Sequence, residues 1–408
     1  MLGVAAWGNN ASGELDDATN VNRTAPVQSV GLTGIRGMSV GAVHGLAIRA
    51  DGTVVAWGHN RSGQLGNGTT TDSFTPVAVS GLSNVRAIAA GSSFSLAVRA
   101  DGAVFAWGNN ASGELGDGNT ADRATPVPVV GLGAGSGVID VAAGGAHALA
   151  LKADGTVLAW GNNASGQLGD GTAPADQLTP VKVTGLGAGS GVVQVSAGGA
   201  FSLALRSSGA VLAWGNNASG ELGDGTTIDR ARPVSVPALG PGSGVRKVAA
   251  GGAFSLALRS NGTVSAWGNN ATGELGDGTA PADHATPVFV TGVSSAIDIG
   301  AGRGHGLALL RAGSVVAWGD NNLGQIGDGT TAQRHTPVDV TTAHALGVLV
   351  GGDHSHALLG AAAGGGGGSG GDNGGGGGGG SSATGGGGTP IPQSGPARTG
   401  RGNPSVTG

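Results

Sequence analysis

Short apolar runs alternate with Gly- and Asn-rich polar loops through the first 360 residues of the chain. Residues 203–215 show the pattern clearly, because the apolar runs 203–205 and 210–214 flank the residues Arg206 to Gly209. Two such runs joined by a turn that contains glycine predict an antiparallel β-hairpin. The tryptophan near its end supplies one large side chain that can anchor the second strand.

The same hairpin recurs with a period close to 50 residues. A tryptophan followed by glycine marks each copy, and successive tryptophans are 50, 50, 53, 54, 53 and 51 residues apart. All the tryptophans of the sequence belong to this series: Trp7, Trp57, Trp107, Trp160, Trp214, Trp267 and Trp318. A repeat of this kind is one supersecondary unit that buries its apolar faces only against its neighbours. We therefore expect one array rather than two or three separate domains.

Each unit contains four predicted strands, which in the second full copy are residues 85–90, 94–99, 104–107 and 126–130. The polar loop 108–118, between the third and fourth strands, is dense in residues that turn the backbone. Four strands in each of seven units predict an all-β fold, a seven-bladed β-propeller of four-stranded antiparallel blades.

Residue size and proline indicate which strands face the axis. The sequence Ala-Ala-Gly-Gly at 142–145 has close copies at 197–199 and 249–252, and residues this small can crowd around a central channel. The first strand is therefore expected to be innermost. The fourth strand carries a proline in every copy: Pro26, Pro76, Pro126, Pro180, Pro233, Pro287 and Pro337. Proline favours an exposed edge, so the fourth strand is expected to be outermost.

The two ends of the repeat region complement each other. Residues 4–8 match a third strand that no second strand precedes, and residues 354–359 match a second strand that no third strand follows. We expect residues 2–8 to pair beside residues 355–360 and close the ring. Residues 1–360 then form the propeller. Residues 361–408, rich in Gly and then containing Pro, are expected to be a disordered tail.

Composition narrows the range of functions. The sequence has no cysteine, so it has neither disulfides nor thiolate metal sites, and cysteine usage says nothing of the redox compartment. A net charge of −5 without a polybasic stripe argues against nucleic acid, and no apolar stretch is long enough to insert into a membrane. We find no signal peptide and expect a monomer. Localisation stays unknown: cytoplasmic by default, or extracellular if the N-terminus is incomplete.

One register position in the second strand alternates between histidine and phenylalanine: His44, Phe94, His147, Phe201, Phe254, His305 and His354. Imidazoles are common metal ligands, but three of the positions carry phenylalanine. We therefore interpret these residues as a structural ring, with each histidine hydrogen-bonded to neighbouring backbone. No metal or other cofactor is expected.

The polar loops repeat an acidic or amide residue and an Asp-Gly pair. The first set is Glu14, Gln64, Glu114, Gln167, Glu221, Glu274 and Gln325, and the second includes Asp117, Asp170, Asp224, Asp277 and Asp328. Calcium binding and glycosidase chemistry are alternatives, but residues that recur in most blades more simply serve the fold. The Asn-Ala-Ser and Asn-Ala-Thr sequences likewise fit turns as well as glycosylation sequons. No unique catalytic cluster stands out, so we expect no enzyme.

The repeat resembles that of the regulator of chromosome condensation family. Residues 104–118, the following Thr-Pro-Val at 125–127 and the sequence Ala-Ala-Gly-Gly-Ala-His-Ala-Leu-Ala-Leu at 142–151 carry the resemblance, which extends over about residues 1–360. The resemblance implies a seven-bladed propeller closed by its two termini, in agreement with the spacing.

The resemblance also suggests functions. The member that gives the family its name is an exchange factor for the small GTPase Ran and uses a wedge and a basic tail, neither of which is visible in this sequence. The propeller-type β-lactamase inhibitor, a distant bacterial relative, binds protein through rim aromatics, whereas the rim here carries Val43, Ser93, Ala146, Ala200, Ala253, Gly304 and Asp353. We therefore interpret the chain as a non-enzymatic protein-interaction scaffold. A guanine-nucleotide exchange factor and a secreted inhibitor of the β-lactamase-inhibitor type are the alternatives.

The loop before the outer-strand proline varies most between copies, and residues free to vary are free of the demands of the fold. It mixes both charges with an occasional apolar side chain, as a polar interface rim does. The candidate residues for binding a protein partner are Phe74, Arg123, Leu178, Arg230, His284 and Arg334. Solvated loops without a partner, or a site on the opposite face around Arg303 and Asp353, are the alternatives.

Overall fold

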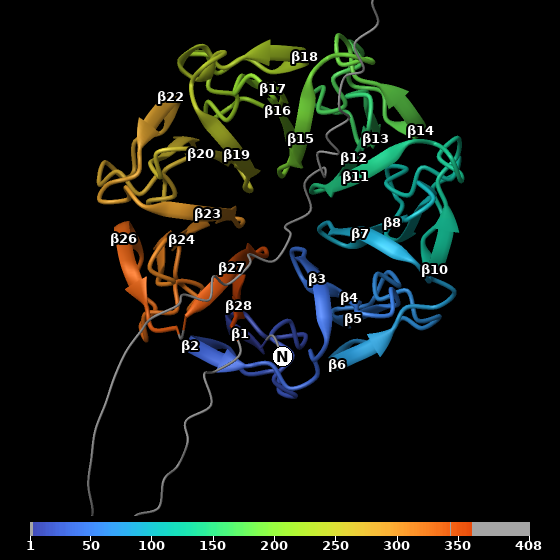
Figure 1. The fold of residues 1–408 in the computed structure, drawn as a ribbon, viewed down its shortest axis with the longest axis horizontal. Helices are drawn as coiled ribbons and strands as arrows, with labels where there is room; N and C mark the ends of the chain where they lie inside the picture. Colours follow the sequence, from blue (N-terminus) through green and yellow to red (C-terminus); the bar gives the residue numbers. More distant parts are fainter. Residues whose placement is uncertain (1–2, 343, 361–408) are drawn as a thin grey trace, which may run out of the picture.

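A computed structural model describes residues 3–342 and 344–360. Within these residues, 28 strands form seven four-stranded antiparallel sheets around a central channel (Figure 1). The 3₁₀ turn η1 (Pro237–Leu239) is the one helical element of the described chain, and no helix there has the length and hydropathy to cross a membrane. The predicted seven-bladed propeller is therefore confirmed. The predicted tail, residues 361–408, lies outside the described residues.

The blades follow the predicted order from the axis outward, and the outermost strands carry the prolines. The innermost strands are β3 (Ile35–Val40), β7 (Val85–Ala90), β11 (Val138–Ala143), β15 (Val192–Ala197), β19 (Val245–Ala250), β23 (Ala296–Ala301) and β27 (Ala345–Val350). The second strands are β4 (His44–Arg49), β8 (Phe94–Arg99), β12 (His147–Lys152), β16 (Phe201–Arg206), β20 (Phe254–Arg259), β24 (His305–Leu310) and β28 (His354–Leu359).

The two outer positions of each blade complete the sheets. The third strands are β1 (Gly3–Gly8), β5 (Val54–Gly58), β9 (Val104–Gly108), β13 (Val157–Gly161), β17 (Val211–Gly215), β21 (Val264–Gly268) and β25 (Val315–Gly319). The outermost strands are β2 (Arg23–Gln28), β6 (Ser73–Ala78), β10 (Arg123–Pro128), β14 (Gln177–Lys182), β18 (Arg230–Ser235), β22 (His284–Phe289) and β26 (Arg334–Val340).

The outermost strands begin earlier than the sequence analysis predicted. β10 starts at Arg123 rather than at Pro126, because Arg123 already pairs with Gly108 of β9. Regular pairing resumes only at Val127, so Pro126 falls within an irregularity between the two paired regions. A residue without a backbone N–H is tolerated at such a place.

The first and last strands of the chain close the ring in one composite blade. Its strand order is β2-β1-β28-β27, and β1 pairs with β28 from Gly3 opposite Leu359 to Gly8 opposite His354. Figure 1 shows these segments side by side although they lie at opposite ends of the described sequence. The predicted closure is confirmed.

Seven main-chain hydrogen bonds of 2.9 to 3.2 Å join neighbouring blades in a complete circle at one end of the channel. They run from Ala42 N to Gly91 O, Ser92 N to Gly144 O, Gly145 N to Gly198 O, Gly199 N to Gly251 O, Gly252 N to Gly302 O, Arg303 N to Gly352 O, and Gly352 N to Gly41 O. A Cβ atom at Gly199 would lie 2.4 Å from the carbonyl oxygen of Gly252, which explains the small residues of the repeat.

Each tryptophan fastens its blade to the preceding one. Trp107 is fully buried against Leu46, Val54 and Leu65 of the neighbouring blade. The indole nitrogens donate hydrogen bonds of 2.7 to 2.9 Å to carbonyl oxygens of the preceding blade, in the pairs Trp7–Gln325, Trp57–Glu14, Trp107–Gln64, Trp160–Glu114, Trp214–Gln167, Trp267–Glu221 and Trp318–Glu274. A buried indole N–H needs such a partner, so each tryptophan joins two blades by packing and by a specific bond.

Candidate functional site

The antiparallel strand order gives the propeller two chemically different faces. The long-loop face carries the loops between third and fourth strands, such as residues 59–72, and the turns that follow the innermost strands, such as 41–43. The hairpin-turn face carries the turns between second and third strands, such as 50–53, and the connections to the next blade, such as 79–84. Acidic side chains outnumber basic ones in the loops of the long-loop face. On the hairpin-turn face, basic residues gather where the second strands end: Arg49, Arg99, Lys152, Arg206 and Arg259.

A buried asparagine organises each long loop. The Nδ2 of Asn110 donates to the carbonyl oxygens of Asn119 and Ala121, both at 3.0 Å, and its Oδ1 accepts the N–H of Leu115 at 2.9 Å. Equivalent asparagines occupy the other blades, and all are buried. The sequon asparagines, including Asn163 and Asn217, therefore serve as loop anchors, with no room for a glycan in the folded protein.

The recurrent acidic or amide residue also has a structural role. The carboxylate of Glu114 accepts the N–H of Ser112 at 2.8 Å, and its main-chain oxygen accepts the indole N–H of Trp160. Burial raises the pKa of Glu114, and the charges of Asp122 and Asp176 raise it further. Neighbouring carboxylates thus make the electrostatic potential at this face negative.

The candidate arginines are tied into their own loops. Arg123 binds Asp117 at 3.0 Å and Arg230 binds Asp224 at 2.7 Å, with each Asp almost fully buried. Arg334 binds Asp328 at 2.5 Å, and His284 lies 3.4 Å from Asp277. The Asp-Gly aspartates are therefore the counter-charges of these basic residues. An aspartate of the same loop balances the charge of each arginine. The basic residues seen in the loop sequence therefore add little positive charge to the surface.

The two apolar candidates cover glycines of the preceding blade. A Cβ atom at Gly13 would lie 2.4 Å from Cδ1 of Phe74, and one at Gly113 would lie 2.6 Å from Cδ2 of Leu178. Phe74 nevertheless remains 40% exposed. The six candidate residues all lie on β6, β10, β14, β18, β22 and β26, where these outermost strands begin. The structure places them on one rim of the long-loop face but does not gather them into a pocket. The expectation that Arg303 and Asp353 lie on the opposite face is wrong, because both occupy turns that follow innermost strands and therefore lie on the long-loop face.

Aspartates of the variable loop immediately precede these strands, and sequence reasoning did not recognise them as a recurrent set. We call them the acidic arc: Asp72, Asp122, Asp176, Asp229 and Asp283. Each accepts through Oδ1 the main-chain N–H of the loop asparagine, at 2.8 or 2.9 Å. None forms a salt bridge with a described residue, and all but the half-buried Asp72 are exposed. The sequence could have revealed them, because they recur at the spacing of the blades, 50, 54, 53 and 54 residues apart.

The residues of the ring of histidines and phenylalanines are buried. The hydrogen-bond partner differs from the prediction, however. His44 Nε2 lies 2.8 Å from Ser95 Oγ, His147 Nε2 lies 2.9 Å from Ser202 Oγ, and His305 Nε2 lies 2.8 Å from Ser355 Oγ. The histidines therefore bind a serine side chain of the next blade, and that serine binds the backbone.

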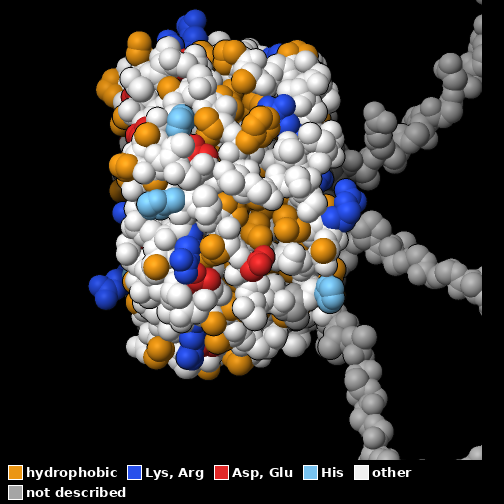
Figure 2. All heavy atoms as spheres, turned by 90° about the vertical axis from the view of Figure 1, so that its left-hand side faces the viewer, with side chains coloured by type: hydrophobic (Ala, Val, Ile, Leu, Met, Phe, Trp, Pro, Cys, Tyr) orange, Lys and Arg blue, Asp and Glu red, His pale blue; other side chains and the backbone are white. Residues whose placement is uncertain are grey.

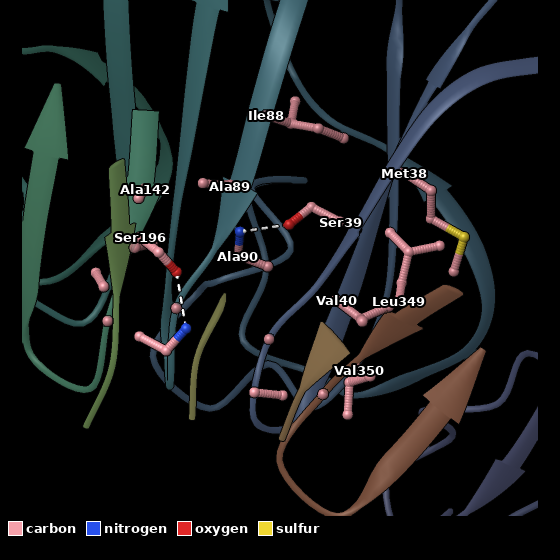
Figure 3. Close-up of a pocket in the computed structure, with 18 of the residues that line it drawn as sticks. Met38, Ser39, Val40, Ile88, Ala89, Ala90, Ala142, Ser196, Leu349 and Val350 are labelled. Carbon is pink, nitrogen blue, oxygen red and sulfur yellow. Dashed lines mark hydrogen bonds between the residues drawn. The ribbon is translucent and has the colours of Figure 1, made fainter. Parts of the chain in front are cut away.

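The innermost strands surround a channel of about 1510 Å³. Small and aliphatic side chains such as Ala89, Ala142 and Val350 line it (Figure 3). Ser39 and Ser196 use their hydroxyl oxygens to accept main-chain N–H groups of Ala90 and Ala250 in other strands, at 3.1 and 3.0 Å. Among the residues that the structure describes, no group of three or more His, Cys, Asp or Glu is arranged to hold a metal ion.

Comparison with known proteins agrees with this architecture. The family model of the RCC1-like domain matches residues 128–395, and models of the regulator of chromosome condensation (RCC1) repeat match residues 51–98 and 101–151, and residues 35–64 and 85–114. The human E3 ubiquitin-protein ligase HERC2 is 39% identical over 199 residues, which are 48% of this chain and 4% of HERC2. The human probable E3 ubiquitin-protein ligase HERC6 is 36% identical over 202 residues, 48% of this chain and 20% of HERC6.

Solved structures extend the similarity to the whole ring. Human WBSCR16 superimposes with a TM-score of 0.77 at 26% identity, covering 88% of this chain and 99% of that protein. Yeast RCC1 (Prp20), solved with Kap60, has a TM-score of 0.77 at 24% identity, covering 88% of both chains. With repeats, blades and closure all in agreement, the chain belongs to the RCC1-like domain family.

Proposed function

We propose that this propeller is a non-enzymatic scaffold that binds a basic region of a partner protein through its long-loop face. The acidic arc is the observation that carries the proposal. Five consecutive blades present a carboxylate at the same structural position, and none of these carboxylates has a cationic partner among the described residues. Carboxylates on one surface reinforce each other's field, which speeds association with a positively charged partner and favours it over others.

The geometry of each arc aspartate suits this role. One carboxylate oxygen holds the loop asparagine, which fixes the side chain, while Oδ2 has no hydrogen-bond partner among the described residues. A side chain that is already held loses little conformational entropy when it binds a lysine or arginine. Phe74 and Leu178, on the strands beside the arc, offer apolar contact area between the charges.

The side of the outer wall that Figure 2 shows is a less suitable surface. On the side that Figure 2 shows, hydrophobic side chains are scattered among polar and charged ones, and basic and acidic groups lie next to each other. Interfaces of stable complexes have an apolar core, which such a surface does not offer. The long-loop face, where acidic side chains outnumber basic ones over several blades, supports the proposal better.

The test exploits an asparagine that occurs naturally at the arc position. Asn22 accepts the N–H of Asn10 at 2.8 Å, as the arc aspartates do for their own loop asparagines. Replacing Asp122, Asp176 and Asp229 together by Asn should therefore keep the loops folded while removing three charges. Residues 1–360 serve as bait to recover partners, and affinity for each is then measured with the parent and the triple variant. We expect a loss of at least about tenfold, and a weaker dependence on salt.

A matched control changes an aspartate of the other face. Asp154 caps the N–H of Thr156 at 2.9 Å in a turn of the hairpin-turn face, so Asp154→Asn alters charge without touching the arc. Unchanged affinity in the triple variant, with an intact circular dichroism spectrum, would reject the arc as the binding site.

Two further assays examine the other functions that the family resemblance suggests. Nucleotide release from a panel of small GTPases would support an exchange factor, and inhibition of β-lactamase would support an inhibitor. Prp20p from Saccharomyces cerevisiae, which binds Gsp1p and histones, shares the fold at 22% identity. HERC2 and HERC6 are named as ligases, but the region that matches this chain covers only 4% and 20% of those proteins.

A further inference from the structure

The second residue of every innermost strand forms a collar around the channel at the hairpin-turn face. Three members are exposed arginines: Arg36, Arg86 and Arg246. The other four are aliphatic: Ile139, Val193, Ile297 and Leu346. All of them except Ile139 line the channel, and Val193 and Leu346 are 36% and 46% exposed. The collar therefore combines cationic and apolar groups and contains no acidic residue.

The fold does not require charge at this position. The seven strands are structurally equivalent, and their second residue is either arginine or an aliphatic side chain. In ring order, Arg36 and Arg86 occupy neighbouring blades, two aliphatic residues follow, then Arg246, then two more aliphatic residues. Ile139 and Ile297 pack against the core of their blades, whereas the arginines at the equivalent positions are exposed, so the fold accepts either type here.

The arginines are oriented without being neutralised. Arg36 Nη2 donates to the carbonyl oxygen of Val85, and Arg246 Nη2 donates to that of Ile297 at 2.8 Å, so each side chain reaches across to the next blade. Neither they nor Arg86 form a salt bridge with a described carboxylate. A guanidinium has five N–H donors, so those not used here can bind another carboxylate.

The charges beside the collar are largely balanced. Lys247 forms a salt bridge with Asp298. Burial raises the pKa of Asp140 to about 6, and the charge of Arg86 opposes this rise. Arg36 and Arg246 form no salt bridge with a carboxylate of the described residues.

We propose that the collar binds an acidic peptide segment of a partner protein, with its carboxylates on the arginines and its aliphatic side chains against Val193, Ile297 and Leu346. This site lies on the face opposite to the acidic arc, so it stands independently of the function proposed above. A partner with acidic and apolar side chains complements both kinds of collar residue.

A peptide fits the collar better than a nucleic acid does. A phosphate backbone carries a charge at every nucleotide and binds best along an unbroken row of cations, usually with aromatic groups for the bases. The collar interrupts its cations with aliphatic pairs and contains no aromatic residue.

Fluorescence anisotropy with the full chain tests the proposal. The probe is a labelled peptide that alternates Asp or Glu with Leu, and the reference is the same peptide with Gln in place of the acids. We expect the acidic peptide to bind at least about tenfold more tightly, and replacement of Arg36, Arg86 and Arg246 together by Gln to remove that preference. Binding should weaken as salt rises, because the contacts are exposed.

Control variants separate the collar from general surface charge. Arg49 and Arg311 are exposed on the same face but outside the collar, so Arg49→Gln with Arg311→Gln should leave peptide binding unchanged. Arg86→Ile introduces the residue that the next blade carries at the equivalent position 139. Because the fold accepts isoleucine there, weaker peptide binding by this variant would reflect the lost charge rather than misfolding. Equal binding of both peptides would overturn the proposal. Tighter binding of duplex DNA, or of phosphatidylserine vesicles, than of the acidic peptide at equal salt would also overturn it.

Discussion

His44 Nε2 lies 2.8 Å from the Oγ of Ser95 in the next blade, and Ser95 Oγ donates in turn to the main-chain oxygen of Gln64. This arrangement repeats wherever a ring histidine is followed by serine in the next blade. The exception is His354, because the blade that follows it in the ring carries Gly45 at the serine position. Both ring nitrogens of His354 lack a hydrogen-bond partner within the described residues. The blade that closes the ring is thus the one where the pairing fails.

Replacing His147 by Phe should reduce the acid sensitivity of the fold. Burial lowers the pKa of His147 from 6.5 to about 4, so the folded state holds it neutral while the unfolded chain takes up a proton below pH 6.5. Its stabilising contribution is complete above pH 6.5 and is lost as pH falls toward 4, at about 1.4 kcal/mol per pH unit. Phe201 beside Ser255 shows that phenylalanine fits this site.

Thermal unfolding of parent and His147→Phe proteins between pH 4 and pH 7 measures this effect. As the pH falls, the melting temperature of the variant should decrease less than that of the parent. His335→Gln, at an exposed position, is the control and should follow the parent. Parallel curves for parent and His147→Phe would show that this histidine does not contribute to acid unfolding.

His356→Leu should stabilise the closing blade. Six blades have a fully buried leucine at this position, such as Leu203 and Leu256, whereas His356 is buried with neither ring nitrogen hydrogen-bonded within the described residues. It packs edge-on against Trp57 and His354 without a hydrogen bond to either. Leaving a buried polar group unsatisfied costs about 1–3 kcal/mol, so we expect a gain of that order.

The reverse substitution provides the matched comparison. Leu203→His places an imidazole at the same position of an internal blade and should destabilise the protein by a similar amount. Denaturant unfolding at neutral pH measures both changes. If His356→Leu were destabilising, the histidine would have a partner that the fold does not reveal.

The sequence was sufficient to predict those features that every blade repeats. Trp107, the proline at 126 and the small residues at 142–145 recur at fixed positions, so strand order and closure followed from their spacing. The repeat spacing did not predict the charge of the long-loop face. Arg123 and Asp122 are adjacent in sequence, but only the folded loop shows that Arg123 is neutralised by Asp117, while Asp122 binds the main-chain N–H of Asn110 and forms no salt bridge with a described residue.

The inter-blade contacts were hidden for a similar reason. His44 and Ser95 are 51 residues apart, and their partnership depends on which neighbouring side chains meet across two blades. The collar likewise required the structure, because Arg36 and Leu346 come together only when the ring closes. Repetition in a sequence therefore predicts the fold, while differences between repeats acquire meaning only from their positions around the axis.

Asp16 should limit the stability of the first long loop at neutral pH. It adopts a φ of +52°, at the position where the other blades have glycines such as Gly66 and Gly116. Burial raises its pKa from 3.8 to about 7, and the nearby charge of Asp17 adds to this rise, while the N–H of Gly31 opposes it. The folded state thus favours the protonated acid, so stability falls as pH rises from 3.8 toward 7.

Two substitutions separate the backbone effect from the charge effect. Asp16→Gly relieves the left-handed conformation, worth about 1 kcal/mol at any pH, and also removes the carboxyl. Asp16→Asn keeps an acceptor for Gly31 and tolerates a positive φ, but cannot ionise. Both variants should exceed the parent in melting temperature most clearly above pH 7. A parent and an Asn variant with identical pH profiles would contradict the assigned ionisation.

Closure by β1 should contribute as much stability as the contacts within an internal blade. Trp7 and Trp214 are both fully buried, and each donates a 2.9 Å hydrogen bond to the preceding blade. Replacing either by Ala removes the same packing and the same bond, at a cost of about 3–5 kcal/mol.

Deleting residues 1–8 goes further, because it removes the partner of both β28 and β2 and exposes the edge of β28. Differential scanning calorimetry should show similar losses for Trp7→Ala and Trp214→Ala, and a broad, less cooperative transition for the deletion. If the deletion melted like the parent, the two ends of the chain would not hold the ring together.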